Sequence, residues 1–358
     1  MTTVYSNTLA GPEDTLAVVE AYAVPVICVG GLIGNTISAI VFLQKSLREN
    51  SSSLFLAARS ISDNGFLATL LTIWASSYYD LRLGNIPPMC QLLIFLTYVF
   101  GCFSIWLVVF VTAENYIRIC RPFLVQNMCN TRNAKVSMLI LLAVILLTYN
   151  FPFWTIGGAC IPLRKYYDFI QILVYIDAVL TLIVPAIIMA LLMSAIAATT
   201  IASCERRRRR STSSCTNVKS PLMKVTTMLL AVTFSFFLLN IPHHVVRLRL
   251  MVLAFVEKNV NTSLSIEIVM QSVSQLLYYL SVSTNVLIYS VFSGKFRKTL
   301  RDIFKRKSTN RTITHNVRDV FYPTRRVNIS MEEILDKDNN DKYPEEAFPL
   351  RRFESSIL

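Results

Sequence analysis

Charge is scarce in this chain. Asp, Glu, Lys and Arg make up 16% of its 358 residues, whereas hydrophobic residues make up 53%. Soluble domains carry about 25% charged residues. The chain also lacks any Cys-x-x-Cys pair or Cys/His spacing typical of zinc sites, so no metal cofactor of that kind is expected. The composition excludes an ordinary soluble domain and favours a membrane protein.

The chain contains long runs of apolar residues. A membrane-spanning helix needs roughly 20 apolar residues, and seven stretches are long enough. They predict an all-α membrane protein, a seven-transmembrane helix bundle over 17–292, with no room for a separate soluble domain. The stretches lie at about 17–44, 53–79, 88–118, 135–157, 168–202, 222–256 and 266–292.

Basic residues are concentrated on one side of these segments. Residues 1–44 contain no Lys or Arg, whereas the connections after the first, third and fifth segments are basic, as is the carboxyl-terminal tail. By the positive-inside rule, residues 1–16 form an extracellular tail and the basic loops face the cytoplasm. The first 15 residues also lack the basic start of a cleavable signal peptide, so we expect the first segment to direct insertion. The net charge of +13 then reflects topology and attraction to anionic lipid, and no nucleic acid partner is expected.

The chain after the seventh segment changes character twice. Residues 293–305 place Phe296, Leu300 and Ile303 on one helical face and basic residues elsewhere, which predicts a short amphipathic helix on the inner leaflet. Residues 306–358 are polar, charged and aperiodic. This composition predicts a disordered cytoplasmic tail.

Few cysteines fall outside the membrane in this topology. Cys90 lies at the outer start of the third segment and Cys160 lies between the fourth and fifth, and both face the oxidising side. We predict that they form a disulfide. Asn261 heads an Asn-x-Ser motif on the same side and is a candidate glycosylation site.

Several short motifs occur in a fixed order on these segments. Together they resemble the rhodopsin-like family of G-protein-coupled receptors over about residues 17–305. The resemblance implies a plasma-membrane receptor that passes an extracellular signal to heterotrimeric G proteins, with arrestin and kinases as further partners, and no enzyme activity. The motifs are Gly34-Asn35, "ISD" ending at Asp63, Cys90, "ENYIRICRP" from Glu114, Pro185, Pro242 and "NVLIY" ending at Tyr289.

The family's usual arginine is missing from the inner face. Glu114 resembles the acid that holds a neighbouring Arg in the family, but Asn115 stands in the place of that Arg, followed by Tyr116. The resemblance therefore implies a G-protein-coupling face of Glu114, Asn115, Tyr116 and Tyr289 with a different closure, for which Arg59 is one candidate partner.

Other departures narrow the ligand class. Thr97 stands where amine receptors of the family carry an Asp, and Tyr279 stands where opsins carry the retinal Lys, which excludes both anchors. Val286 replaces the Pro that is usual in the last motif. Versions of this motif without Pro resemble some invertebrate neuropeptide receptors, including those for short amidated peptides.

Polar residues follow one face of the sixth segment and a matching face of the seventh. Such residues avoid lipid and face the bundle interior. They predict a peptide-binding pocket in the outer half, with Arg247 suited to the terminal carbonyl of the peptide; the alternative interpretation is polar contact between helices. The predicted pocket residues are Thr97, Asp177, Asn240, His243, His244, Arg247, Gln271, Gln275 and Tyr279.

Asp63 is an acid at mid-membrane depth. Asn35, Ser104, Ser281 and Asn285 stand at the positions that line the family's sodium site, and hard oxygen ligands suit such an ion. Arg59 lies one helical turn before Asp63 and could replace the sodium. Both partners remain open at this stage.

The leading hypothesis is a G-protein-coupled receptor for a short neuropeptide. Asn115 raises the alternative of a ligand-binding receptor that does not signal. A transporter or proton pump that uses Asp63 and Glu114 as a relay is a further alternative, but the internal repeats of many transporters are not visible. The ligand and the G-protein class stay undetermined by sequence.

Overall fold

The computed structural model describes residues 12–81, 83, 86, 88–157, 160–210, 231–235, 238–246, 248–249 and 264–305. The chain divides into two units, Met1–Ile303 and Phe304–Leu358, and the fold below belongs to the first. In the described ranges all regular elements are helices, and the one β-pairing is an isolated bridge between Ile156 and Pro162. The all-α prediction is therefore confirmed.

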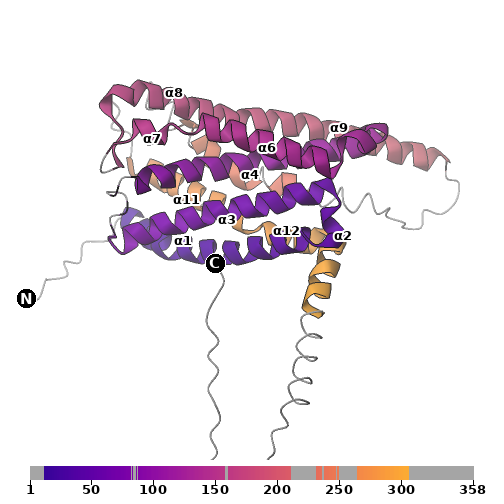
Figure 1. The fold of residues 1–358 in the computed structure, drawn as a ribbon, viewed down its shortest axis with the longest axis horizontal. Coiled ribbons are helices and arrows are strands. Elements are labelled where there is room, and N and C mark those ends of the chain that lie inside the picture. The colour runs from indigo at the N-terminus through magenta and orange to yellow at the C-terminus, as the bar shows by residue number, and fades with distance from the viewer. Residues whose placement is uncertain are drawn as a thin grey trace, which may run out of the picture. The chain divides into compact units, whose positions relative to one another are not determined.

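The long helices lie side by side, with α1 against α3, α3 against α4 and α4 against α6 (Figure 1). Short helical turns connect them. The longer elements are α1 (Pro12–Phe42), α3 (Ser51–Tyr78), α4 (Met89–Cys120), α6 (Thr131–Thr148), α8 (Tyr167–Ala178), α9 (Val184–Arg210), α11 (Leu264–Ser283) and α12 (Asn285–Phe292). The shorter ones are α2 (Lys45–Arg48), α5 (Val125–Met128) and α7 (Pro152–Thr155), with residues 231–235 and 238–246 also helical.

Four helices in the described part are long and apolar enough to cross a membrane: Val18–Phe42, Met89–Cys120, Thr131–Thr155 and Arg164–Ser203. The helix α3 is less apolar because its inward side carries serines together with Arg59 and Asp63, all buried. Polar residues of a spanning helix belong on the bundle side. The burial pattern of α3 therefore fits an interior helix.

The fourth predicted segment ends earlier than expected. The Asn130 side chain caps the start of α6 by accepting from the Asn133 backbone N–H at 2.7 Å. The helix ends at Thr148, and Pro152 then begins the separate turn α7. A proline lacks the N–H that a continuing helix needs and fits the first turn of a new one. The predicted segment 135–157 therefore consists of two helical pieces.

The fifth predicted segment contains an irregular turn. Residues Val179–Ile183 form the π-helical turn η5, which joins α8 to α9. Thr181 Oγ1 donates to the Asp177 carbonyl at 2.7 Å within this region. A π-helical turn adds one residue to the helix and changes the direction of the side chains before it.

A disulfide closes the end of the bundle that the sequence predicts to be extracellular; this end is called the outer end below, and the opposite end the inner end. Cys90 at the start of α4 is bonded to Cys160, and their Cα atoms lie 5.8 Å apart. Gln91 Nε2 also donates to the Ile156 carbonyl at 2.6 Å. The structure confirms the predicted disulfide. The bond attaches the connection between α7 and α8 to the start of α4.

Two glycines bring α1 close to its neighbours. A Cβ added at Gly31 would lie 2.5 Å from Leu67 Cδ1 and 2.6 Å from Ser283 Cβ, and one added at Gly34 would lie 2.7 Å from Val286 Cγ1. Such distances leave no room for a larger residue. The glycines therefore allow α1 to pack directly on α3, α11 and α12.

The predicted helix after the seventh segment is present, since residues 294–305 are helical. Phe296 is fully buried and packs against Phe42 and Tyr289, with ring centroids 5.4 and 5.9 Å apart. Leu300 and Ile303 pack on the same core. The apolar face thus binds the inner end of α1 and α12, and contact with the leaflet stays a prediction. The predicted tail 306–358 and residues 1–11 lie outside the described residues.

Candidate functional site

A cavity of about 680 Å³ lies in the outer part of the bundle, beside the part of α4 that follows Cys90. Its volume is in the usual range for ligand pockets. Helices α3, α4, α8 and α11, the turn η5 and residues 243–246 form its walls. Predicted pocket residues that line it are Thr97, Asp177, His243, His244, Gln271, Gln275 and Tyr279.

Asp177 places a carboxylate in the wall of this cavity. The residue is only 4% exposed, and the Tyr149 hydroxyl donates to its Oδ1 at 2.7 Å. The ring of Tyr149 stacks on Tyr98, another cavity residue, with centroids 5.4 Å apart. A buried carboxylate is costly unless donors or a cation compensate it. The cavity therefore favours a ligand group that is positively charged.

The opposite wall combines amides with aromatic rings. Gln275 Nε2 donates to the Tyr279 hydroxyl at 2.6 Å, and the His243 ring stacks on Tyr278 with centroids 5.0 Å apart. Gln271 and Ser274 lie on the same helix and line the same space. This wall offers hydrogen bonds to a peptide backbone and flat surfaces to aromatic side chains.

A smaller cavity of about 380 Å³ adjoins the first between α1, α3 and α11. Ile73, Gln275 and Tyr279 line both cavities, so the Gln275–Tyr279 hydrogen bond lies between them. The smaller cavity contains a carboxylate of its own, that of Glu20, beside Trp74. Asp177 on α8 therefore lines the larger cavity, and Glu20 on α1 lines the smaller one. The hydrogen-bonded Gln275–Tyr279 pair lies between the two cavities.

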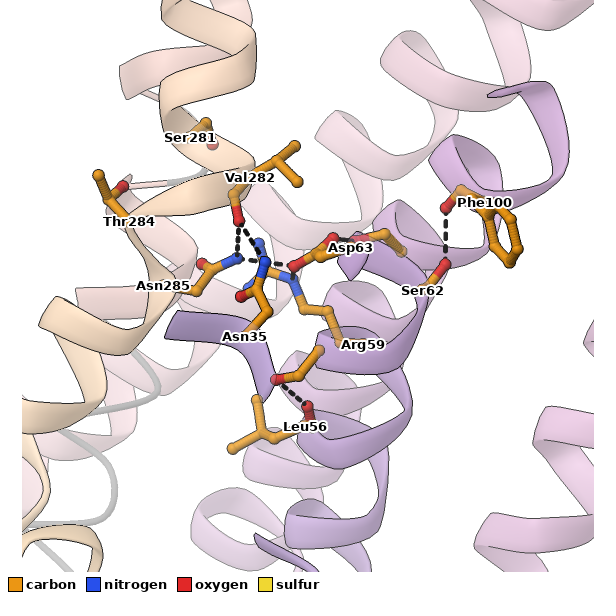
Figure 2. A network of polar contacts seen from close by, with 12 residues as sticks. Asn35, Leu56, Arg59, Ser62, Asp63, Phe100, Ser281, Val282, Thr284 and Asn285 are labelled. Atoms are coloured by element: carbon orange, nitrogen blue, oxygen red, sulfur yellow. Dashed lines mark hydrogen bonds and ion pairs between the residues drawn. The ribbon is translucent and has the colours of Figure 1, made fainter. Parts of the chain in front are cut away.

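Asp63 is the centre of a buried polar network (Figure 2). Ser104 Oγ donates to its Oδ1 at 2.5 Å, and Asn285 Nδ2 donates to its Oδ2 at 2.8 Å. Arg59 Nε lies 3.7 Å from the same Oδ2, as an ion pair within α3. Asn35 Nδ2 donates to the Val282 carbonyl at 3.1 Å, which is also an acceptor for Asn285.

Three of the predicted sodium-site residues, Asp63, Ser104 and Asn285, thus meet directly. Ser281 instead accepts from Asn240 Nδ2 at 3.1 Å. This bond places Asn240 below the cavity, outside its lining. Its predicted role in ligand contact stays a prediction.

The inner end of α4 contains a second buried network. Ser51 Oγ donates to Glu114 Oε1, and Ser52 Oγ donates to Glu114 Oε2 at 2.6 Å. Arg118 Nη2 donates to Glu114 Oε1 at 3.0 Å and to Asn50 Oδ1 at 2.7 Å. The acid is therefore held by α3 and by a basic residue one turn further along its own helix.

Arg118 is a residue that the sequence analysis did not single out. It replaces Arg59 as the partner of Glu114, because Arg59 pairs with Asp63. The spacing of Glu114 and Arg118 is the i,i+4 arrangement that favours ion pairs on a helix. That spacing was visible in the sequence and could have identified the pair.

Cys129 lies next to this network, in the connection between α5 and α6. Its backbone carbonyl accepts from Ser51 Oγ at 3.1 Å. Burial, and then the negative charge of Glu114, raise the pKa of the Cys129 thiol above its usual value, while Arg118 acts in the opposite direction. The thiol is therefore held in its neutral form more strongly than an ordinary cysteine.

A family model described as 7 transmembrane receptor (rhodopsin family) matches residues 34–289. The chain belongs to this family. The receptor is similar to an FMRFamide peptide receptor of Caenorhabditis elegans, with 25% identity over 80% of this chain and 69% of that protein. It is also similar to an FMRFamide receptor of Drosophila melanogaster, with 22% identity over 78% of this chain and 53% of that protein, so it spans about half of that relative.

Membership of the family places the receptor in a membrane as a seven-transmembrane bundle, with signalling as its function and no enzyme activity. Coupling to G proteins is general to the family, and the plasma membrane is its typical location. This result supports the receptor hypothesis over the transporter alternative. The fine assignment of individual site residues stays a prediction.

The receptor's predicted coupling residues are divided between α4 and α12. Asn115 is buried beside Glu114, Tyr116 is half-buried, and Tyr289 on α12 is fully buried with its ring 5.0 Å from that of Phe42. Two predicted site residues, Arg247 and Asn261, lie outside the described residues.

Proposed function

We propose that the receptor binds a short amidated peptide with a basic side chain and couples this binding to a G protein. The observation that carries the proposal is the buried Asp177 in the wall of a cavity whose other side chains are mainly aromatic, amide and aliphatic. The names of its relatives support the choice, because FMRFamide in one-letter code is Phe-Met-Arg-Phe with an amidated end. Such a peptide has one guanidinium, two aromatic rings and a terminal amide.

The chemistry of the cavity matches these groups. A guanidinium forms paired hydrogen bonds with a carboxylate, which fits Asp177. Aromatic rings fit beside Phe66 and Tyr278, and a terminal amide can both donate to and accept from Gln271 and Gln275. In this arrangement the peptide enters from outside the cell, consistent with the predicted extracellular amino terminus of the receptor.

The test is a screen of short peptides in matched amidated and free-acid forms, with calcium and cyclic-nucleotide readouts on cells that express the receptor. An amidated, arginine-containing peptide should activate. We then expect Asp177→Asn to reduce potency about ten- to a hundredfold, since a hydrogen bond to a charged group contributes about 1.5–3 kcal/mol and 1.4 kcal/mol is about tenfold. Replacing the peptide's arginine by citrulline should have a similar effect.

Asp168→Asn is the matched control. Asp168 lies on the same helix, is exposed and does not line the cavity, so potency should stay within about twofold at equal surface expression. Equal potency of Asp177→Asn and the unchanged receptor would contradict the proposed anchor. Activation without regard to amidation or arginine would contradict the proposed ligand class.

The smaller cavity suggests where the other end of the peptide lies. Its Glu20 carboxylate would attract the free amino-terminal ammonium of the peptide. Acetylating the amino terminus should therefore weaken binding to the unchanged receptor, and the loss should disappear in Glu20→Gln. If acetylation weakens both equally, the amino terminus lies elsewhere.

A further inference from the structure

The carboxylate of Asp63 already has a cation beside it. Arg59 and Asp63 are both buried, at 3% and 1% exposure, and Arg59 Nε lies 3.7 Å from Asp63 Oδ2. No other acidic side chain in the described residues forms an ion pair with Arg59. One positive and one negative charge therefore compensate each other inside the bundle.

The groups around Asp63 do not suit a sodium ion. Both of its carboxylate oxygens accept hydrogen bonds, one from the Ser104 hydroxyl and one from the Asn285 amide nitrogen. A cation needs oxygen lone pairs, whereas Asn285 presents N–H groups and Ser281 accepts from Asn240 elsewhere. Sodium would also enter next to a fixed guanidinium and meet repulsion of the same order as its attraction to Asp63.

Some polar atoms near Asp63 have no hydrogen-bond partner in the described part of the chain, and their chemistry bears on whether a sodium ion fits there. Arg59 Nε and Nη1 have no acceptor within hydrogen-bond distance among the described residues, and Asn35 Oδ1 likewise has no donor. Tyr289 is close enough to Arg59 for the two groups to interact electrostatically. A molecule that enters this region therefore meets the Arg59 N–H donors together with the Asn35 amide oxygen. This combination suits water, and the guanidinium charge repels a free cation.

We propose that Arg59 is a tethered counter-ion that takes the place of a sodium ion at Asp63. The receptor then holds no sodium at this position. Its stability depends on the Arg59–Asp63 pair and does not respond to sodium. A tethered cation also differs from a free one in that it cannot leave, so the charge balance at Asp63 is independent of the ion concentration outside the cell.

The experiment measures thermal unfolding of the purified full-length receptor in NaCl and in choline chloride at equal ionic strength. The unchanged receptor should show the same Tm in both salts, to within about 1 °C. Arg59→Leu should lower Tm in choline chloride and gain a saturable rise with sodium, because it frees Asp63 for the ion. Arg59→Lys keeps a positive charge and should remain insensitive to sodium.

Asp63→Asn provides a second test that does not require Arg59→Leu to fold. It should lower Tm because it leaves the Arg59 charge buried and uncompensated, and Arg59→Leu combined with Asp63→Asn should recover most of that loss. A saturable rise of Tm with sodium in the unchanged receptor that Asp63→Asn abolishes would overturn the proposal. An Asp63→Asn receptor as stable as the unchanged one would overturn it as well.

Discussion

Glu114 lies at the inner end of α4 and accepts hydrogen bonds from Ser51, Ser52 and Arg118. The carboxylate is 6% exposed and the Arg118 side chain 20% exposed, so the pair is only partly shielded from water. Arg118 also binds Asn50 at the start of α3. The family usually carries an Arg directly after this acid. Here Arg118 supplies the positive charge one helical turn later and links α4 to α3.

We expect Arg118→Ala to lower the free energy of unfolding by about 1.5–3 kcal/mol, because it removes a hydrogen bond to a charged, buried carboxylate. The freed inner end should also raise signalling in the absence of ligand. Arg121→Ala is the control, since Arg121 is exposed and follows the same helix end, whereas the ion-pair partner of Glu114 is Arg118. Thermal unfolding in detergent and basal cyclic-nucleotide levels measure the two effects. Equal behaviour of the two variants would contradict the role of Arg118.

The raised pKa of Cys129 predicts slow alkylation at neutral pH. The thiolate is the reactive form, so the rate should rise about tenfold per pH unit and continue to rise beyond the ordinary cysteine pKa of about 8.5. The unfolded thiol ionises first as pH increases, and therefore the contribution of Cys129 to stability is present below that pKa and decreases above it. Maleimide labelling of permeabilised cells, with Cys129→Ser to identify the signal, measures the rate. A rate that levels off below pH 8.5 would contradict the assigned direction.

The sequence contained the information for both buried ion pairs, because each is an i,i+4 pair on one helix. The sequence indicated Arg59 as one of two possible partners of Asp63, beside sodium. It did not single out the Glu114–Arg118 pair, because the unusual residue of that motif is Asn115. The serine partners of Glu114 could not be predicted in the same way. Ser51 and Ser52 lie on another helix, and their contact with Glu114 depends on how α3 packs against α4.

Among the elements, we expect the π-helical turn η5 to set the direction of Asp177, which lies two residues before it. Each residue of an α-helix rotates the chain by about 100°. One extra residue in η5 therefore changes the direction in which the side chains of α8 point relative to those of α9. Deleting Val179 should therefore turn Asp177 away from the cavity and reduce peptide potency at least as much as Asp177→Asn, with surface expression retained. Reinserting Ala after Ile183 restores the length and should recover binding. Unchanged potency in the deletion variant would show that η5 does not position the anchor.

Hydrophobic periodicity predicted the existence and approximate bounds of the long helices but not their interruptions. The breaks at Thr148, at Val179–Ile183 and at Thr284 depend on local geometry. Pro152 gave a signal for the first of them. The π-helical turn follows from packing between helices, which periodicity along one helix does not report.

For the whole molecule, the disulfide and the orientation can be tested together. An impermeant maleimide should label Cys90 and Cys160 on intact cells only after reduction, and an amino-terminal epitope should be detected without permeabilisation. Cys160→Ser should weaken peptide binding, because the bond closes a separation of 70 residues. The entropic stabilisation of such a closure is about 4 kcal/mol at most, since membrane insertion already restricts the helices. Labelling of both thiols without reduction would contradict the orientation.

The close approach of α1 to α3, α11 and α12 through Gly31 and Gly34 has a consequence for measuring motion. The α1 backbone at these glycines lies directly against the side chains of Leu67, Ser283 and Val286, so sliding along its neighbours would produce steric overlap. These helices therefore provide a fixed frame of reference within the receptor. Spin or fluorescent labels that follow activation should be paired with one reporter on α1, because a distance change measured from there reports displacement of the other helix alone.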